Sequence, residues 1–151
     1  MKHNLFDIVV IGGGHAGVEA ALIADHYELS VLLITMDPKA VGRMSCNPAI
    51  GGLAKGQIVR EIDVLGGLMA SLADKTGLQF KTLNKKKGRA VWSPRAQIDK
   101  RHYEKLVVKT LDASNVVVLS GEVVSLVYNG TAIGGVAVSY THLTLPTILL
   151  V

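Results

Sequence analysis

The stretch FDIVVIGGGHAGVEAALIADHYELSVLLIT, residues 6–35, decides the fold. Residues 6–11 form a continuous apolar run rich in β-branched side chains, which is typical of a strand buried on both faces. A glycine-rich turn at 12–17, an alanine-rich helical segment and a second apolar run at 30–35 follow. Because the whole pattern fits within about 30 residues, it predicts one βαβ unit with parallel strands and a right-handed crossover.

The glycine-rich turn reads GGGHAG and fits the pattern G-x-G-x-x-G. Gly12 allows the tight exit from the strand, Gly14 leaves no Cβ to obstruct a pyrophosphate, and Gly17 lets the helix pack on the sheet. Backbone N–H groups at the helix N-terminus then point at the phosphates, assisted by the helix dipole. The turn predicts a dinucleotide-binding site, and a glycine turn without a ligand is the alternative. We expect His15 to fill a place in the loop rather than to perform chemistry.

The acidic residue that usually binds the ribose is harder to place. It is expected at the end of the second strand, about 20 residues beyond the glycines. This chain has Thr35 there, and Asp37 lies just beyond it. Asp37 is a candidate ligand of a ribose hydroxyl, and it is equally well explained as a turn residue before Pro38.

The composition limits the class of protein. The chain has 151 residues, of which 49% are hydrophobic, and this suits one domain with a core. Its formal net charge of +4 permits an anionic partner without requiring one. A single cysteine excludes an internal disulfide and a cysteine metal cluster, so we expect a cytoplasmic protein. The apolar run near the N-terminus is too short for a membrane span, and it lacks the cleavage site of a signal peptide.

The rest of the chain predicts further strands and helices around this unit. Residues 58–69 have helical spacing, with a break at Gly66-Gly67, and residues 78–83 alternate as in a strand. Ser93-Pro94 resembles a helix start, with serine as the cap and proline in the first turn. The helix after it would bury Ile98, Leu106, Val107 and Leu111. Residues 116–119 predict a strand, and residues 123–128 followed by Asn129-Gly130 predict a β-hairpin.

The segment VSYTHLTLPT, residues 138–147, has a different character. One DNA string that encodes it is GTC TCT TAT ACA CAT CTG ACG CTG CCG ACG, which resembles a transposase-type sequencing adapter. We therefore expect that residues 138–151 are not native, that the gene was interrupted at about Ala137, and that residues 1–137 are an incomplete domain. An ordinary edge strand that ends in an apolar terminus is the alternative.

A second glycine-rich loop, MSCNPAIGGLAKGQ at 44–57, carries a family resemblance. Together with GGGHAGVEAA, IVREIDVLGGLM, GLQFKTLN, KKGRAV and RAQIDK, it closely resembles the MnmG (GidA) family over residues 6–136. The resemblance implies a Rossmann-type α/β fold that binds FAD, here incomplete, with a parallel sheet, flanking helices and a β-hairpin. The family's FAD loop corresponds to Gly12, Gly13, Gly14, His15, Ala16 and Gly17, and a backbone contact to the adenosine side corresponds to Val123.

The resemblance also implies an activity and partners for the full-length protein. The family acts with the GTPase MnmE to add a carboxymethylaminomethyl or aminomethyl group to the wobble uridine of certain tRNAs. Methylenetetrahydrofolate supplies the carbon, NADH supplies reducing equivalents, and the protein is expected to be a homodimer. The family's NADH-binding insertion and helical C-terminal region have no counterpart in this sequence.

The second loop suits the other end of FAD. Asn47, Gly51 and Gly52 can lie under the flat flavin ring, where larger side chains would collide, and backbone N–H groups there can tune its reduction. Lys55 would favour the anionic reduced flavin. A plain turn with a helix start is the alternative. Cys46 is a weak candidate for a catalytic thiol near the flavin, and we favour a small buried packing residue instead.

A basic segment completes the candidate sites; it consists of Lys85, Lys86, Lys87, Arg89, Arg95, Lys100 and Arg101, with Trp92 among them. It would either follow RNA phosphates or form a solvated face. Arg89 or Arg95 is alternatively a ligand of the FAD phosphates. Without the resemblance, the residues alone also fit a generic FAD- or NAD-dependent oxidoreductase acting on a small substrate, or a binding module without turnover.

Overall fold

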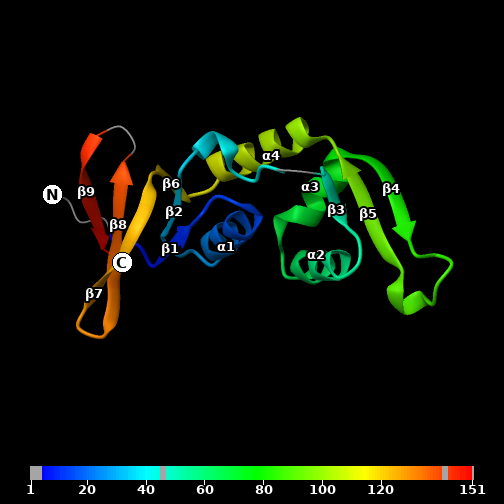
Figure 1. Ribbon diagram of the computed structural model, residues 1–151, viewed down its shortest axis with the longest axis horizontal. Coiled ribbons are helices and arrows are strands. Elements are labelled where there is room, and N and C mark those ends of the chain that lie inside the picture. The colour runs from blue at the N-terminus through cyan, green and yellow to red at the C-terminus, as the bar shows by residue number, and fades with distance from the viewer. Residues whose placement is uncertain (1–4, 45–46, 141–142, 151) are drawn as a thin grey trace. The chain divides into compact units, whose positions relative to one another are not determined.

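The computed structural model describes residues 5–44, 47–140 and 143–150 (Figure 1). The chain forms two units. The first comprises residues 1–41 and 110–151, and the second comprises residues 42–109.

The first unit contains the predicted βαβ arrangement. Strands β1 (Ile8–Ile11), β2 (Val31–Thr35) and β6 (Val117–Ser120) form a parallel sheet in the order β1-β2-β6. Helix α1 (His15–His26) connects β1 to β2, and it buries Val18, Ala21 and Ala24. The predicted α/β fold with parallel strands and a flanking helix is thereby confirmed.

Burial across this sheet differs in one respect from the expectation. The central strand β2 is buried over Val31–Ile34, as its apolar run predicts. Strand β1 is only half-buried and its last residue, Ile11, is exposed. The expectation that residues 6–11 are buried on both faces was therefore wrong for the described chain, because β1 pairs with β2 alone and lies at the edge of the sheet.

A short hydrogen-bonded link fixes the start of β1 against the start of β2. One carboxylate oxygen of Asp7 accepts hydrogen bonds from the backbone N–H and the hydroxyl of Ser30, both at 2.8 Å. The backbone N–H of Asp7 donates to the Ser30 hydroxyl at 3.0 Å. These bonds favour the ionised carboxylate, so they lower the pKa of Asp7 below its ordinary value of 3.8.

We expect Asp7→Asn to lower the free energy of unfolding at neutral pH, because the amide loses the charge that Ser30 stabilises. Since the folded-state pKa of Asp7 is lowered, its contribution is present above the ordinary pKa of 3.8 and is lost as the pH falls below it. The difference between wild type and variant should therefore shrink below about pH 4 in denaturant titrations. In a Ser30→Ala background, Asp7→Asn should lower the free energy of unfolding by less. An equal loss in that background would contradict the hydrogen-bonded link between Asp7 and Ser30.

An antiparallel sheet completes the first unit. It contains β7 (Glu122–Asn129), β8 (Ala132–Tyr140) and β9 (Leu143–Leu150) in that order. The predicted β7–β8 hairpin is confirmed, but its two loop residues are Gly130 and Thr131, because Asn129 pairs with Ala132. Gly130 has φ +64°, which suits the first position of such a turn. Leu32 and Ile34 of β2 share a buried cluster with Val136 and Val138 of β8.

Residues 138–151 span the end of β8 and all of β9. Strand β9 pairs with β8, from Gly135 opposite Leu150 to Tyr140 opposite Leu143. Strand pairing reports conformation and not the origin of the codons, so the adapter origin of this segment stays a prediction.

The second unit combines a small antiparallel sheet with helices. Strands β3 (Ala49–Gly51), β5 (Ser93–Ile98) and β4 (Gly77–Leu83) pair in that order. Helices α2 (Lys55–Val64) and α3 (Leu68–Thr76) precede β4, and α4 (Lys100–Asp112), which belongs to this unit up to Lys109, follows β5. The predicted break between α2 and α3 is confirmed, since Gly66 has φ +91°. Two 3-10 turns, η1 (Pro38–Ala40) in the first unit and η2 (Arg89–Val91) in the second, complete the described elements.

The predicted helix start at Ser93-Pro94 was wrong, because these residues begin strand β5. A residue before proline is biased towards extended backbone. Pro94 lies one residue before Arg95, the first residue of β5 that pairs with β3, so its missing N–H interrupts little of that ladder. The helix begins instead at Lys100, where the Asp99 carboxylate accepts from the backbone N–H of His102 at 3.0 Å. Ile98 is buried as expected, but on the strand.

Candidate cofactor-binding site

The first glycine-rich loop leaves β1 through a backbone conformation that favours glycine. Gly12 has φ +105°, and its N–H donates to the carbonyl of Ile34 at 2.8 Å, so the loop stays attached to β2. A side chain at Gly12 would meet no atom within 4 Å, but it would be strained by the positive φ. The tight exit predicted for Gly12 is therefore present.

Gly14 presents an open position at the start of α1. It is the N-cap residue with φ −73° and ψ −179°, and no side chain caps the helix there. A Cβ built on Gly14 meets nothing within 4 Å. The first intrahelical bond runs from the Val18 N–H to the Gly14 carbonyl at 3.0 Å, so the N–H groups of residues 15–17 have no acceptor within the helix. Gly12, Gly14 and Ala16 are all exposed. This opening fits an anionic group such as a pyrophosphate.

Gly13 and Gly17 have packing reasons for lacking a side chain. A Cβ on Gly17 would lie 1.9 Å from the carbonyl oxygen of Gly12, so only glycine allows the first turn of α1 to approach the loop. A Cβ on Gly13 would lie 2.8 Å from the hydroxyl oxygen of Thr35. His15 is half-buried beside them. Direct contacts of Gly13, His15, Ala16 and Gly17 with a cofactor stay predictions.

The end of β2 lies beside this loop. Thr35 lies close to Gly13, since a Cβ built on Gly13 would lie 2.8 Å from the Thr35 hydroxyl oxygen. Asp37 caps the 3-10 turn η1, because its carboxylate accepts from the backbone N–H of Lys39 at 2.9 Å. Asp37 thus has the turn role that was one of its two explanations. Its side chain is also exposed, so a ribose contact stays a prediction.

Val123 lies in the core of the first unit. It is half-buried on β7 and packs against the cluster of Leu32, Ile34, Val136 and Val138. The ladder shifts register between Val123 and Ser125, so β7 has an irregular backbone at this point. The side chain therefore has a structural role, and the predicted backbone contact to a cofactor stays a prediction.

The second glycine-rich loop forms a strained turn between β3 and α2. Gly51 and Gly52 have φ +104° and φ +98°, and Ala54, a non-glycine residue, has φ +59°. The N–H of Gly52 donates to the Pro94 carbonyl at 2.9 Å. A Cβ on Gly51 would lie 2.2 Å from that same carbonyl oxygen. A Cβ on Gly52 would meet no atom nearer than a methyl carbon of Leu83, at 4.0 Å. Gly51 is thus required by packing against β5, and Gly52 offers an accessible backbone face.

The remaining predicted residues of this loop are exposed. Asn47 lies at its start and Lys55 is the first residue of α2. Cys46 lies outside the described residues. The placement of Asn47, Gly51, Gly52 and Lys55 under a flavin ring stays a prediction.

A buried hydroxyl beside this loop was not predicted from sequence. Ser93 is 0% exposed, and its Oγ has no hydrogen-bond partner in the described structure. A Cβ on Gly56, in the first turn of α2, would lie 2.8 Å from that Oγ. Ser93 was interpreted as a helix cap, and no local sequence signal indicates its position against α2.

The second unit also contains a groove of about 620 Å³. Its apolar walls include Ile50, Val59 and Phe80, and its charged rim includes Arg60, Asp63, Asp74, Lys81, Lys85 and Arg95. Phe80 is 59% exposed. The volume lies in the range of small-molecule sites. The sequence signal that could have indicated it was Phe80, an aromatic residue between polar neighbours on the outward side of a strand.

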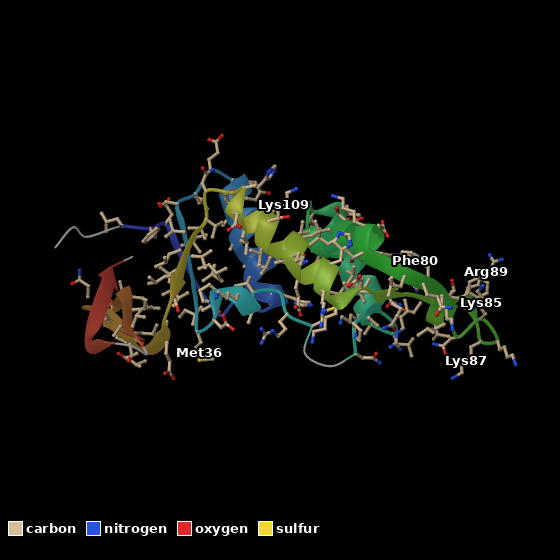
Figure 2. The ribbon with its side chains drawn as sticks, turned by 90° about the horizontal axis from the view of Figure 1, so that it is seen from above. Met36, Phe80, Lys85, Lys87, Arg89 and Lys109 are labelled. Carbon is tan, nitrogen blue, oxygen red and sulfur yellow. The ribbon has the colours of Figure 1, made fainter. Side chains whose placement is uncertain are left out.

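The basic segment is spread over three parts of the second unit. Lys85, Lys86, Lys87 and Arg89 lie in the connection between β4 and β5. Figure 2 shows Lys85, Lys87 and Arg89 together at the tip of that hairpin. Arg95 lines the groove, and Lys100 and Arg101 begin α4. An approach of Arg89 or Arg95 to FAD phosphates stays a prediction.

The fold and the first loop together define a dinucleotide-binding α/β protein of the Rossmann type. A family model described as "Glucose inhibited division protein A" matches residues 7–148. The chain therefore belongs to the GidA family. No helix in the described ranges has the length and apolar character that a membrane span requires.

Relatives and solved structures agree with this assignment. The protein named "tRNA uridine 5-carboxymethylaminomethyl modification enzyme MnmG" is 54% identical over 81% of this chain in Sulfurihydrogenibium sp. strain YO3AOP1, and 49% identical over 87% in Aquifex aeolicus. The chain spans only 20% and 21% of the length of those relatives. The structure of Aquifex aeolicus GidA is 47% identical, with a TM-score of 0.86 over 91% of this chain and 23% of that chain. The flavin-dependent brominase Bmp2, at 20% identity and a TM-score of 0.62 over 96% of this chain and 36% of that chain, shares the fold alone.

Proposed function

We propose that this chain is the FAD-binding N-terminal part of a cytoplasmic enzyme that modifies the wobble uridine of certain tRNAs. In this proposal the full-length protein acts with an MnmE-like GTPase and adds a carboxymethylaminomethyl or aminomethyl group. Methylenetetrahydrofolate supplies the carbon, NADH supplies reducing equivalents, and the full-length protein is a homodimer.

The observation that carries the proposal is the open N-terminus of α1 within a member of this family. Gly14 leaves room at the loop, and the N–H groups of Ala16 and Gly17 in the first turn have no acceptor within the helix. The names of the relatives add the substrate class, because they describe enzymes that modify a uridine of tRNA.

We infer the following roles for individual residues in this site. The backbone of Gly14 and Ala16 would bind the pyrophosphate of FAD, while Gly12 and Gly17 hold the loop in shape. Gly52 would present its backbone to the flavin ring, which supplies the capacity to accept and donate a hydride. Lys55, one turn further, would add positive charge on that side.

The experiment is to express the full-length protein in a host lacking its own enzyme for this uridine modification. We expect the purified protein to show a flavin absorbance spectrum. We also expect mass spectrometry of nucleosides from that host's tRNA to show the modified wobble uridine restored. A protein with flavin but no restored modification would favour an oxidoreductase acting on a small substrate, and a protein without flavin would contradict the proposal.

A further inference from the structure

The hairpin formed by residues 77–98 carries more than the whole of the chain's net positive charge. It contains no aspartate or glutamate and six cationic residues: Lys81, Lys85, Lys86, Lys87, Arg89 and Arg95. The whole chain has a formal net charge of +4, so the residues outside the hairpin have a net charge of −2. Charge concentrated on one element in this way attracts a polyanion to that element rather than to the surface in general.

These cations are accessible. Every one except Arg95 is exposed, and Lys85, Lys87 and Arg89 extend from the tip (Figure 2). Aromatic side chains lie among them, since Phe80 is 59% exposed and Trp92 is 40% exposed. Exposed aromatic faces beside cations are the combination that binds single-stranded nucleic acid, because bases stack on the rings while the cations neutralise phosphates.

The tip of the hairpin has a defined conformation. The Asn84 side-chain amide donates to the Val91 carbonyl at 3.2 Å, and the Trp92 indole N–H donates to the Lys87 carbonyl at 3.0 Å. The Lys87 N–H donates to the Asn84 carbonyl at 2.8 Å. The Arg89 guanidinium lies over the Trp92 ring, 5.7 Å from its centroid. A backbone that is already ordered loses less entropy when it binds a partner.

We propose that this hairpin binds the ribose–phosphate backbone of a single-stranded region of the RNA substrate. The inference rests on the proposed function, which supplies RNA as the polyanion. Lys85, Lys86 and Lys87 contact phosphates without reading sequence. An acidic protein surface is the other partner that such charge would attract, and the exposed Phe80 and Trp92 favour RNA over it.

The test compares the full-length wild type with a Lys85→Ala/Lys86→Ala/Lys87→Ala variant in tRNA binding at several salt concentrations. Each lost phosphate contact should reduce the slope of log affinity against log salt by about 0.7, so the triple variant should lose about 2 from the slope. We expect its affinity for tRNA at low salt to fall at least about tenfold. Flavin content should stay at the wild-type level, which shows that the protein is folded.

The matched control removes three other exposed lysines from the same unit: Lys75→Ala/Lys105→Ala/Lys109→Ala. It changes the net charge equally and should retain most of the affinity and slope. A Lys85→Arg/Lys86→Arg/Lys87→Arg variant should bind as wild type does. If the triple alanine variant folds poorly, Lys86→Ala alone should still reduce the slope by about 0.7.

The outcomes separate this inference from the proposed function. If the wild type modifies tRNA and the triple alanine variant binds tRNA with wild-type affinity and slope, the hairpin proposal is overturned while the proposed function stands. Equal losses in the triple alanine variant and its control also overturn it, because total charge would then explain the effect. A wild type that neither binds nor modifies tRNA overturns both.

Discussion

Gly14→Val in the full-length protein is expected to give a folded protein that has lost its flavin. The new side chain fits the protein itself, because a Cβ at Gly14 meets nothing within 4 Å and the backbone φ of −73° is ordinary. The cost to folding should be about 1 kcal/mol, from a poorer N-cap residue. The same side chain would occupy the place of the pyrophosphate. Losing two N–H bonds to phosphate, at about 2 kcal/mol each, would weaken FAD binding by about a thousandfold.

The measurement is the ratio of flavin to protein absorbance after purification, with circular dichroism to verify the fold. Ala20→Val is the matched control, since Ala20 is exposed on the same helix and gains the same type of side chain. It should retain the cofactor and cost about 0.7 kcal/mol in helix propensity. Wild-type flavin content in the Gly14→Val protein would show that the loop does not hold the cofactor.

Gly17→Ala is expected to have a different and more general effect. Its single added methyl group would lie 1.9 Å from the carbonyl oxygen of Gly12, and backbone atoms cannot move aside as a flexible side chain does. We expect α1 to shift away from the loop, with a loss of about 3 kcal/mol in the free energy of unfolding. Flavin should be lost together with stability.

The contrast between the two glycines is what distinguishes a ligand position from a packing position. Thermal unfolding of the apoproteins measures it directly, because no cofactor contributes to either value. Gly17→Ala should unfold at a clearly lower temperature than Gly14→Val. Similar unfolding temperatures for the two apoproteins would refute the assignment of Gly17 to packing.

Much of this architecture could be predicted from the sequence because its signals are local. The apolar run before Gly12, the small residues of α1 and the run over Val31–Thr35 specify a βαβ unit without help from distant residues. The break at Gly66 followed from the same kind of signal. Such segments need only backbone preference and periodicity to be recognised.

The predictions were wrong where contacts between distant parts of the chain determine the secondary structure or the packing. Ser93-Pro94 matches a helix start locally, but pairing with Leu83 and Thr82 of β4 makes it a strand. The packing roles of Gly51 and Gly56 depend on Pro94 and Ser93, which lie about 40 residues further along the chain. No local pattern reveals such contacts.

The central claim is that the backbone at the start of α1 binds the pyrophosphate of FAD, and a crystal structure of the full-length protein with FAD tests it most directly. We predict a phosphate oxygen within about 2.7–3.2 Å of a backbone nitrogen among residues 14–17, with Gly14 facing the pyrophosphate. A pyrophosphate bound elsewhere, with solvent filling the space beside Gly14, would contradict the account.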